Sequence, residues 1–212
     1  MPFTIHLSIV IFLPLAAGLI AAFLPAKVGR WLVVGATLGV LAYVVAMLID
    51  FDGESGRLRY VTDDNWISEL GIRWQLGVDG LNLFLIALTA LLWVPATLWS
   101  ALRTEERQRL FMFHMALAET AVLGAFCAQD LAVFVVFFDL MLVPFYFLIG
   151  GWGAGDRVAA TTRFVIYTFV GSLLMLAGAI ATGVLAAQNG GQLSFALSDL
   201  QAHVLSKGTQ QW

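Results

Sequence analysis

Residues 126–152, FCAQDLAVFVVFFDLMLVPFYFLIGGW, decide the fold class of this chain. They form an apolar run of membrane-spanning length, with one acid, Asp139, near its middle and Pro144 five residues later. A carboxylate at the depth of the hydrocarbon costs roughly 2.5–3.5 kcal/mol by insertion scales, so an acid retained there is by default a candidate functional group. The stretch therefore predicts a transmembrane helix that contains a site.

A second acid, Glu119, lies on the preceding apolar run. The turn between the two runs is expected near Gln129, ten residues from each acid. At a rise of ~1.5 Å per residue both acids lie about 15 Å from the turn, close to the midplane of a ~30 Å hydrocarbon core. Two acids at one depth on neighbouring helices indicate a proton or cation site.

The composition places the whole chain in a membrane. Apolar residues make up 60% of it and charged residues 12%, and the mean hydropathy is +0.89. A soluble domain carries about a quarter charged residues. The single cysteine, Cys127, excludes an internal disulfide and a cysteine-ligated cluster. Because no nucleotide loop, zinc-ligand spacing or Ser/His/Asp pattern stands out, we expect no cofactor, metal or nucleic acid on this chain, and any redox chemistry on other chains.

Six apolar runs are long enough to span a bilayer, and they predict an all-α, polytopic membrane helix bundle. They cover residues 5–25, 31–50, 81–102, 110–128, 131–150 and 163–187. The first run has no basic residue before it and no small-residue cleavage site after it, which favours a retained helix over a signal peptide. Gly35-x-x-x-Gly39 in the second run is a possible helix-packing face.

The loop over residues 51–79 is the only sizeable hydrophilic segment between apolar runs. Its apolar residues alternate with polar residues or glycine, which predicts a short β-hairpin on the outer surface. Asp79-Gly80-Leu81 opens the third helix, and we favour a helix-capping role for Asp79 over a catalytic one.

Basic residues distinguish the two sides of the membrane. One side carries loops 26–30, 103–109 and 151–162 with the adjacent helix start, and the short turn near Gln129 on the other side has no Lys or Arg. The positive-inside rule therefore predicts that the side with the basic loops is cytoplasmic and that the N-terminus lies outside, in the periplasm of an inner (plasma) membrane. The basic residues are Lys27, Arg30, Arg103, Arg107, Arg109, Arg157 and Arg163.

Each candidate has a structural alternative. Asp139 could be a protonated acid that only hydrogen-bonds a neighbouring helix. We favour a functional role because Pro144 cannot donate to the carbonyl of Leu140, which leaves a hydrogen-bond acceptor beside the acid. Glu119 gains weight from its matching depth. His114 could extend a proton path, or it could be an ordinary histidine near the membrane surface. The six runs contain no lysine to pair with either acid.

Four stretches resemble the chain M subunit family of bacterial NADH–quinone oxidoreductase (respiratory complex I), which is related to the Mrp-type cation/proton antiporters. The stretches are GVDGLNLFL (77–85), LAETAVLGAFCAQDL (117–131), FFDLMLVPFYFLIGGWG (137–153) and RFVIYTFVGSLLML (163–176). The resemblance implies a proton-translocating, antiporter-like membrane-arm subunit, whose partners are other membrane-arm subunits, the lipid bilayer and protons. NADH, flavin, iron–sulfur clusters and quinone are then expected on partner subunits.

By position, Asp139 falls on the family's acid of the fifth helix, which is usually glutamate, and Glu119 on the acid of the fourth. Family members have about fourteen helices, and the seventh and eighth supply the lysines that partner these acids. The resemblance thus implies an N-terminal part, with SKGTQQW (206–212) leading into a seventh helix. We expect three regions: 1–109, 110–188 as the start of the proton-translocating core, and 189–212 as an outer loop.

Two alternatives remain open at this point. The chain could be a subunit of a Mrp-type sodium/proton antiporter without a redox partner. It could also be a transport-inactive fragment with a purely structural or assembly role.

Overall fold

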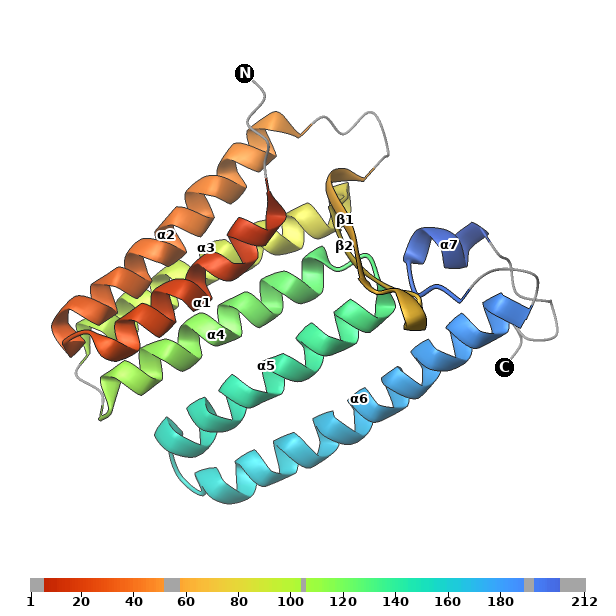
Figure 1. The fold of residues 1–212 in the computed structure, drawn as a ribbon. Coiled ribbons are helices and arrows are strands. Elements are labelled where there is room, and N and C mark those ends of the chain that lie inside the picture. Colours follow the sequence, from red (N-terminus) through yellow and green to blue (C-terminus); the bar gives the residue numbers. More distant parts are fainter. Residues whose placement is uncertain (1–5, 52–57, 104–105, 189–192, 203–212) are drawn as a thin grey trace.

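The structure is a computed structural model that describes residues 6–51, 58–103, 106–188 and 193–202. In this part of the chain, six long helices lie side by side, and a β-hairpin and a short helix lie at one end of them (Figure 1). The helices are α1 (Leu7–Phe23), α2 (Ala26–Asp50), α3 (Gly80–Leu102), α4 (Gln108–Cys127), α5 (Leu131–Trp152), α6 (Arg157–Gln188) and α7 (Leu197–Ala202). The hairpin consists of β1 (Arg59–Ile67), the 3-10 turn η2 (Ser68–Leu70) and β2 (Ile72–Val78).

The helices confirm the predicted membrane bundle. Five of them, α2 to α6, are long and apolar enough to cross a membrane. The apolar helix α1 has 17 described residues. At ~1.5 Å per residue such a helix measures about 25 Å, which is less than a ~30 Å hydrocarbon core. The described residues therefore hold five candidate spans and one shorter apolar helix, where six spans were expected.

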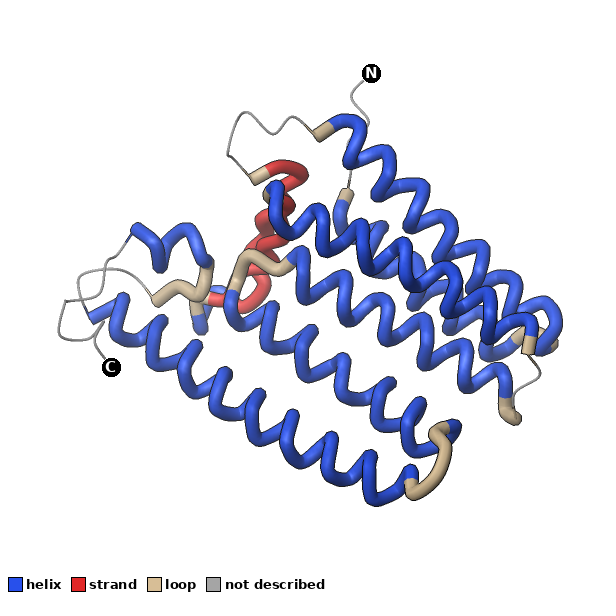
Figure 2. Tube along the Cα trace, turned by 180° about the vertical axis from the view of Figure 1, so that it is seen from behind, coloured by secondary structure: helices blue, strands red, loops and turns tan. Residues whose placement is uncertain are grey.

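Helix α4 is the centre of the bundle. It packs against α1, α2 and α3 on one side and against α5 on the other, and α6 packs mainly on α5 (Figures 1 and 2). Most of the α4 side chains are consequently buried, whereas most of α6 is exposed. An apolar helix with an exposed surface is expected where lipid is the solvent.

The close helix contacts are made at Gly18 and Gly124, which lie outside the Gly35-x-x-x-Gly39 motif. A Cβ added at Gly18 of α1 would lie 2.7 Å from Ala116 Cβ of α4, and one added at Gly124 of α4 would overlap the Phe137 ring of α5. A Cβ at Gly35 would meet no atom within 4 Å, and at Gly39 only Leu13 at 3.5 Å. Within the described residues, Gly35-x-x-x-Gly39 therefore makes no close helix contact, unlike the possibility that the motif raised.

The predicted hairpin and the predicted helix cap are both present. β1 pairs with β2 in an antiparallel register, and Gly71, at φ +67°, makes the turn. A Cβ there would overlap the backbone of Leu193, so both the left-handed conformation and the close approach require glycine. Asp79 Oδ1 accepts from the N–H of Leu81 (2.9 Å) and Asn82 (2.8 Å), and Asn82 Oδ1 accepts from Asp79 N–H (2.6 Å).

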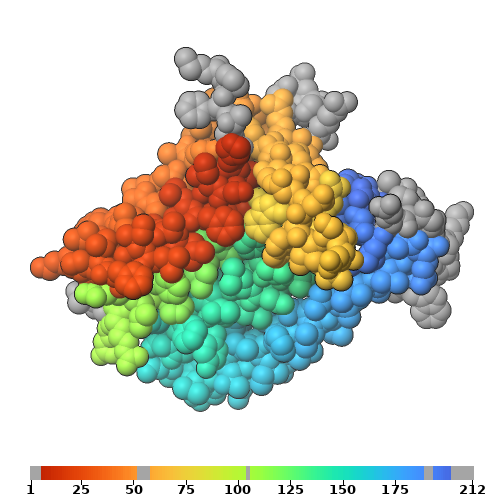
Figure 3. Space-filling model, viewed as in Figure 1, coloured from red at the N-terminus to blue at the C-terminus, as the bar shows by residue number. Residues whose placement is uncertain are grey.

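The two ends of the bundle differ in structure. The connections between α1 and α2, α3 and α4, and α5 and α6 lie at one end, which we call the basic end after its predicted basic residues. The other end, the hairpin end, carries the hairpin, the α4–α5 turn and α7. In the space-filling view the hairpin (yellow) lies between α1 (red) and the blue C-terminal segments (Figure 3). Part of loop 51–79 (52–57) and the predicted approach to a seventh span (206–212) lie outside the described residues.

Candidate functional site

Helix α5, which carries Asp139, is held at its start by an N-cap. The Asp130 carboxylate accepts hydrogen bonds from the N–H of Ala132 (2.8 Å) and Val133 (3.3 Å). The helix then runs through Pro144 to Trp152. Because proline has no N–H, the carbonyl of Leu140 loses its helical donor one residue after Asp139, as the sequence predicted.

Asp139 is partly buried and lies on the side of α5 that faces α6. Its Oδ1 is buried and has no hydrogen-bond partner among the described residues. Gly150 lies eleven residues later, which at ~100° per residue places it on nearly the same face. A Cβ added at Gly150 would lie 3.4 to 3.8 Å from Thr161 of α6. The acid is thus directed toward the less covered side of the bundle.

Glu119 is completely buried, on a side of α4 that is turned away from its contact with α5. Both carboxylate oxygens are buried and lack a hydrogen-bond partner among the described residues. Met112 and Leu123, seven residues before and four after Glu119, share its face of the helix. Met112 belongs to a core cluster with residues of α1, α2 and α3, and Leu123 to a larger one that also includes residues of β2 and α5. Glu119 therefore lies on a face of α4 that packs into the core of the bundle.

The two acids are at similar depth but belong to different helix contacts. The contact between α4 and α5 is made where Gly124 meets the Phe137 ring. Gly124 is about 140° around α4 from Glu119, at ~100° per residue. No hydrogen bond or ion pair joins Glu119 to Asp139 within the described residues. The helix bounds place both acids eight residues from the turn, as expected. Their side chains do not form a direct pair within the described residues.

His114 lies between α4 and α5 in an aromatic environment near the basic end. Its Nδ1 is 2.7 Å from the Leu110 carbonyl oxygen. A carbonyl can only accept, so this contact places the proton on Nδ1 and leaves Nε2 as an acceptor in the neutral ring. The ring centroid lies 4.7 Å from that of Phe147 and 6.3 Å from that of Trp152. His114 is therefore a residue of the α4–α5 contact, about a turn and a half from Glu119.

Asp130 is a structural residue that the sequence analysis missed. Besides capping α5, its Oδ2 accepts from the N–H of Arg73 in β2 (3.2 Å), and its side chain is fully buried. Burial raises the pKa of Asp130, against the opposing effect of its hydrogen bonds to backbone N–H groups and of the Arg73 charge. An acid directly before a long apolar run is an N-cap signal, so the position could have been found from the sequence.

The α4–α5 turn also forms backbone hydrogen bonds with two other segments, strand β2 and the segment before α7. Gln129 N–H donates to the Gln75 carbonyl (2.9 Å), and Leu131 N–H donates to the Phe195 carbonyl (2.9 Å). The hairpin, the turn and the segment before α7 are therefore joined by backbone hydrogen bonds. Among the described residues, no three His, Cys, Asp or Glu side chains gather as a metal site would require.

The sequence is similar to a known group of membrane subunits. Residues 128–211 match the family described as NADH:quinone oxidoreductase/Mrp antiporter, transmembrane. The chain is 35% identical over 187 residues to NADH-quinone oxidoreductase subunit M of Rhodobacter capsulatus, covering 85% of this chain and 36% of the relative. It is 37% identical over 202 residues to NAD(P)H-quinone oxidoreductase chain 4 1 of a Picosynechococcus species, covering 92% and 36%. It thus spans about a third of the length of these curated relatives.

Solved structures of similar fold point to the same group of membrane subunits. A chain in respiratory complex I from Thermus thermophilus with bound NADH has a TM-score of 0.82 and 27% identity, over 95% of this chain and 40% of that one. A chain of the Mrp complex from Dietzia sp. DQ12-45-1b has a TM-score of 0.73 at 19% identity, over 92% and 20%, and shows the shared fold. The comparisons together support the reading of this chain as part of an antiporter-like membrane subunit similar to subunit M (chain 4) of NADH–quinone oxidoreductase.

Proposed function

We propose that the chain acts in a proton-translocating membrane-arm subunit of NADH–quinone oxidoreductase. Proton transfer through it would be coupled to NADH oxidation and quinone reduction on other subunits. NADH, flavin, iron–sulfur clusters and quinone then belong to partner subunits, and this chain contacts other membrane-arm subunits, lipid and protons. The protein would lie in the plasma (inner) membrane with its N-terminus outside.

The observation that carries the proposal is the environment of Asp139. A partly buried acid near the middle of α5 has an oxygen without a partner among the described residues, and the next residue has a carbonyl freed by Pro144. Such groups offer a proton carrier and an adjacent acceptor for water. Asp139 is the proposed principal carrier, Glu119 a second carrier, and His114 a subsidiary group nearer the basic end.

The test uses inverted membrane vesicles that contain the assembled complex. Asp139→Asn keeps the volume and a hydrogen-bonding group but cannot bind and release a proton. We expect it to lower NADH-driven proton pumping roughly tenfold or more, as loss of a proton-transfer group does. Asp139→Glu, which introduces the residue usual in the family, should keep or raise pumping. NADH oxidation with an artificial electron acceptor and the amount of assembled complex serve as controls.

Near-normal pumping by assembled Asp139→Asn complexes would contradict the assignment and favour the structural or assembly role. The Mrp-type alternative predicts a different result, namely sodium/proton exchange in vesicles that needs no NADH. Sodium/proton exchange is included as an alternative because this chain shares its fold with a chain of the Mrp complex. Measuring pH gradients with and without sodium, and with and without NADH, separates the two transport functions.

A further inference from the structure

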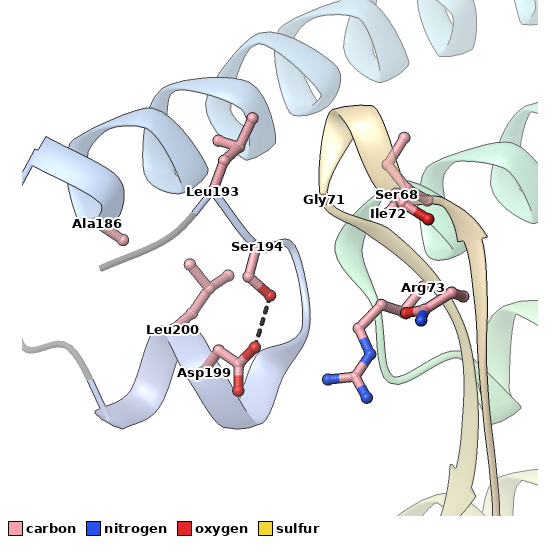
Figure 4. Close-up of a pocket in the computed structure, with 10 residues that line it drawn as sticks. Ser68, Gly71, Ile72, Arg73, Ala186, Leu193, Ser194, Asp199 and Leu200 are labelled. Carbon is pink, nitrogen blue, oxygen red and sulfur yellow. Dashed lines mark hydrogen bonds between the residues drawn. The ribbon is translucent and has the colours of Figure 1, made fainter.

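Glu119 is a buried acid whose oxygens have no hydrogen-bond partner among the described residues. The polar pocket at the hairpin end shows the usual arrangement, in which Ser194 Oγ donates to Asp199 Oδ2 (2.7 Å; Figure 4). A neutral acid tolerates the lack of a partner at a modest cost, whereas a carboxylate without a donor is far less stable in an apolar core. A buried carrier that releases its proton therefore needs a hydrogen-bond donor.

Two side chains of α3 fix the register of this helix against α4. The two helices run in opposite directions (Figure 1). Asn82 Nδ2 donates to the Phe126 carbonyl (3.1 Å), and Trp93 Nε1 donates to the Met115 carbonyl (3.1 Å). The two donors are eleven residues apart on α3, and so are the two acceptors on α4. The helices are therefore in step over this length.

Thr89 lies opposite Glu119 in this register. Glu119 is four residues from Met115, and Thr89 is four residues from its partner Trp93. A count of seven from the other bonded pair leads to the same two residues. At ~100° per residue, Thr89 and Glu119 each lie within about 40° of the residues that bond the two helices together. Both side chains are thus on the facing sides of α3 and α4, at the same level.

The Thr89 hydroxyl is able to change its acceptor. Thr89 is buried, and its Oγ1 donates to the Leu85 carbonyl (2.8 Å). That carbonyl also accepts the N–H of Thr89 within the helix, so it stays hydrogen-bonded when the hydroxyl turns away. A hydrogen bond to a carboxylate is roughly twice as strong as one to a neutral acceptor. Ionisation of Glu119 therefore favours rotation of the hydroxyl toward it.

Charged groups on the neighbouring helices are not placed to take this role. Helices α1 and α3 contain no charged residue or histidine, and the charged residues of α2 lie close to its ends. The titratable residue in the middle of α2, Tyr43, lies toward Tyr60 of the hairpin. On α4 itself His114 contacts Phe147 of α5, and Asp139 belongs to the side of α5 that faces α6.

The other buried hydroxyls lie elsewhere. Thr120 is about 100° around α4 from Glu119 and accepts from the Leu15 N–H of α1 (3.1 Å). Thr37 and Thr97 bond each other between α2 and α3 (3.2 Å), eight residues, or about 12 Å, farther along α3.

We propose that Thr89 is a positioning residue for Glu119. Its hydroxyl donates to the carboxylate when Glu119 has released its proton, and it donates to the Leu85 carbonyl when the acid is neutral. The inference rests on the proposed role of Glu119 as a second proton carrier, and it adds the group that stabilises the ionised form.

Carbodiimide labelling of the assembled complex tests this hydrogen bond. Dicyclohexylcarbodiimide reacts with the protonated form of a carboxyl group, and mass spectrometry of the α4 peptide measures the adduct on Glu119. The ratio of labelling at alkaline pH to labelling at neutral pH reports how much of the acid stays protonated. Thr89→Val keeps the shape of the side chain but removes the donor. The ratio should therefore rise about tenfold, as loss of one charge-assisted hydrogen bond predicts.

Two variants serve as controls for the labelling. Thr89→Ser keeps the hydroxyl and should give the parent ratio. Thr168→Val removes a hydroxyl that bonds its own helix in the same way, to the Phe164 carbonyl (2.8 Å), but on α6, and it should also leave the ratio unchanged. An unchanged ratio in Thr89→Val, or an equal rise in Thr168→Val, would overturn the proposal. If Thr89→Val does not assemble, Thr89→Ala removes the hydroxyl without added bulk and decides in the same way.

NADH-driven pumping in the same vesicles separates this inference from the carrier role of Glu119. If Glu119 carries protons, Thr89→Val should lower pumping and should add no further loss to Glu119→Gln. Independent losses that multiply in the double variant would contradict a shared role. Normal pumping by Glu119→Gln would contradict the carrier role alone, because the labelling ratio still shows whether Thr89 bonds the ionised acid.

Discussion

Glu119 and Asp130 are both fully buried acids, yet their surroundings are opposite. Asp130 accepts three backbone N–H groups, and its position holds β2 against the start of α5. Glu119 has no hydrogen-bond partner among the described residues and lies on a face of α4 that packs into the apolar core. A buried polar group without a partner destabilises a fold, whereas a satisfied one specifies it. The two acids should therefore respond to substitution in opposite directions.

Asp130→Ala should lower the free energy of unfolding by about 1–3 kcal/mol, because the helix loses its cap and buried N–H groups lose their acceptor. Asp130→Asn keeps one oxygen as the acceptor for Ala132 and Val133 but turns a donor toward the Arg73 N–H, so it should cost about 0.5–1 kcal/mol, less than Asp130→Ala. The raised pKa of Asp130 means that the folded state favours the neutral acid. Its contribution is present at acid pH and lost as pH rises through the folded-state value. Asn should remove this pH dependence.

Unfolding can be followed through the single cysteine. Cys127 is fully buried, so a thiol-reactive fluorescent dye reports its exposure as the detergent-solubilised protein is heated. Equal melting temperatures for Asp130→Ala and Asp130→Asn would show that the cap contributes little.

Glu119→Met replaces the unpartnered acid by an apolar side chain of similar length. It should raise the free energy of unfolding by about 1–3 kcal/mol, since replacing a buried ionisable group by a well-packed apolar one is often stabilising. If Glu119 is the second carrier, pumping falls in the same variant, but by less than in Asp139→Asn. A lower melting temperature in the Cys127 assay would instead show that the carboxyl has a partner, such as bound water.

The helices and the hairpin could be predicted because their signals are local. Apolar length predicts α2 to α6, alternation predicts the hairpin, and Asp79 is recognisable as a cap from the residues that follow it. Depth along a helix also follows from counting residues. The rotation of α4 does not, because it is set by distant partners such as Phe137, and so the sequence could not show that Glu119 faces away from α5.

Helix packing gives a matched test of this point. Gly124→Ala adds a methyl group that overlaps the Phe137 ring, and it should cost about 1–3 kcal/mol of stability. Gly35→Ala adds the same group where no atom lies within 4 Å, and it should be neutral or stabilise α2 by about 0.5–1 kcal/mol. Adding Phe137→Leu should partly restore Gly124→Ala. Equal melting temperatures for the two glycine variants would argue against the close α4–α5 contact.

The bundle has two chemically different ends, and this asymmetry bears on its orientation in the membrane. Seven basic residues cluster at the basic end. The hairpin end also has arginines, and one of them, Arg73, pairs with Asp63. Cytoplasmic loops carry the excess of Lys and Arg in membrane proteins, and acidic residues weigh little in this rule. The balance therefore favours a cytoplasmic basic end and an external hairpin.

This orientation can be measured on intact cells with engineered cysteines. Glu69 at the hairpin tip and Ala154 in the α5–α6 connection are both exposed, while native Cys127 is buried and should remain silent. A membrane-impermeant thiol reagent should label Glu69→Cys on intact cells, and Ala154→Cys only after the membrane is permeabilised. The parent chain, with Cys127 alone, provides the background. Because α4 and α5 are joined at the hairpin end, the same result would place the turn between Glu119 and Asp139 outside the cell. Labelling of Ala154→Cys but not Glu69→Cys on intact cells would contradict the predicted orientation and place the α4–α5 turn in the cytoplasm.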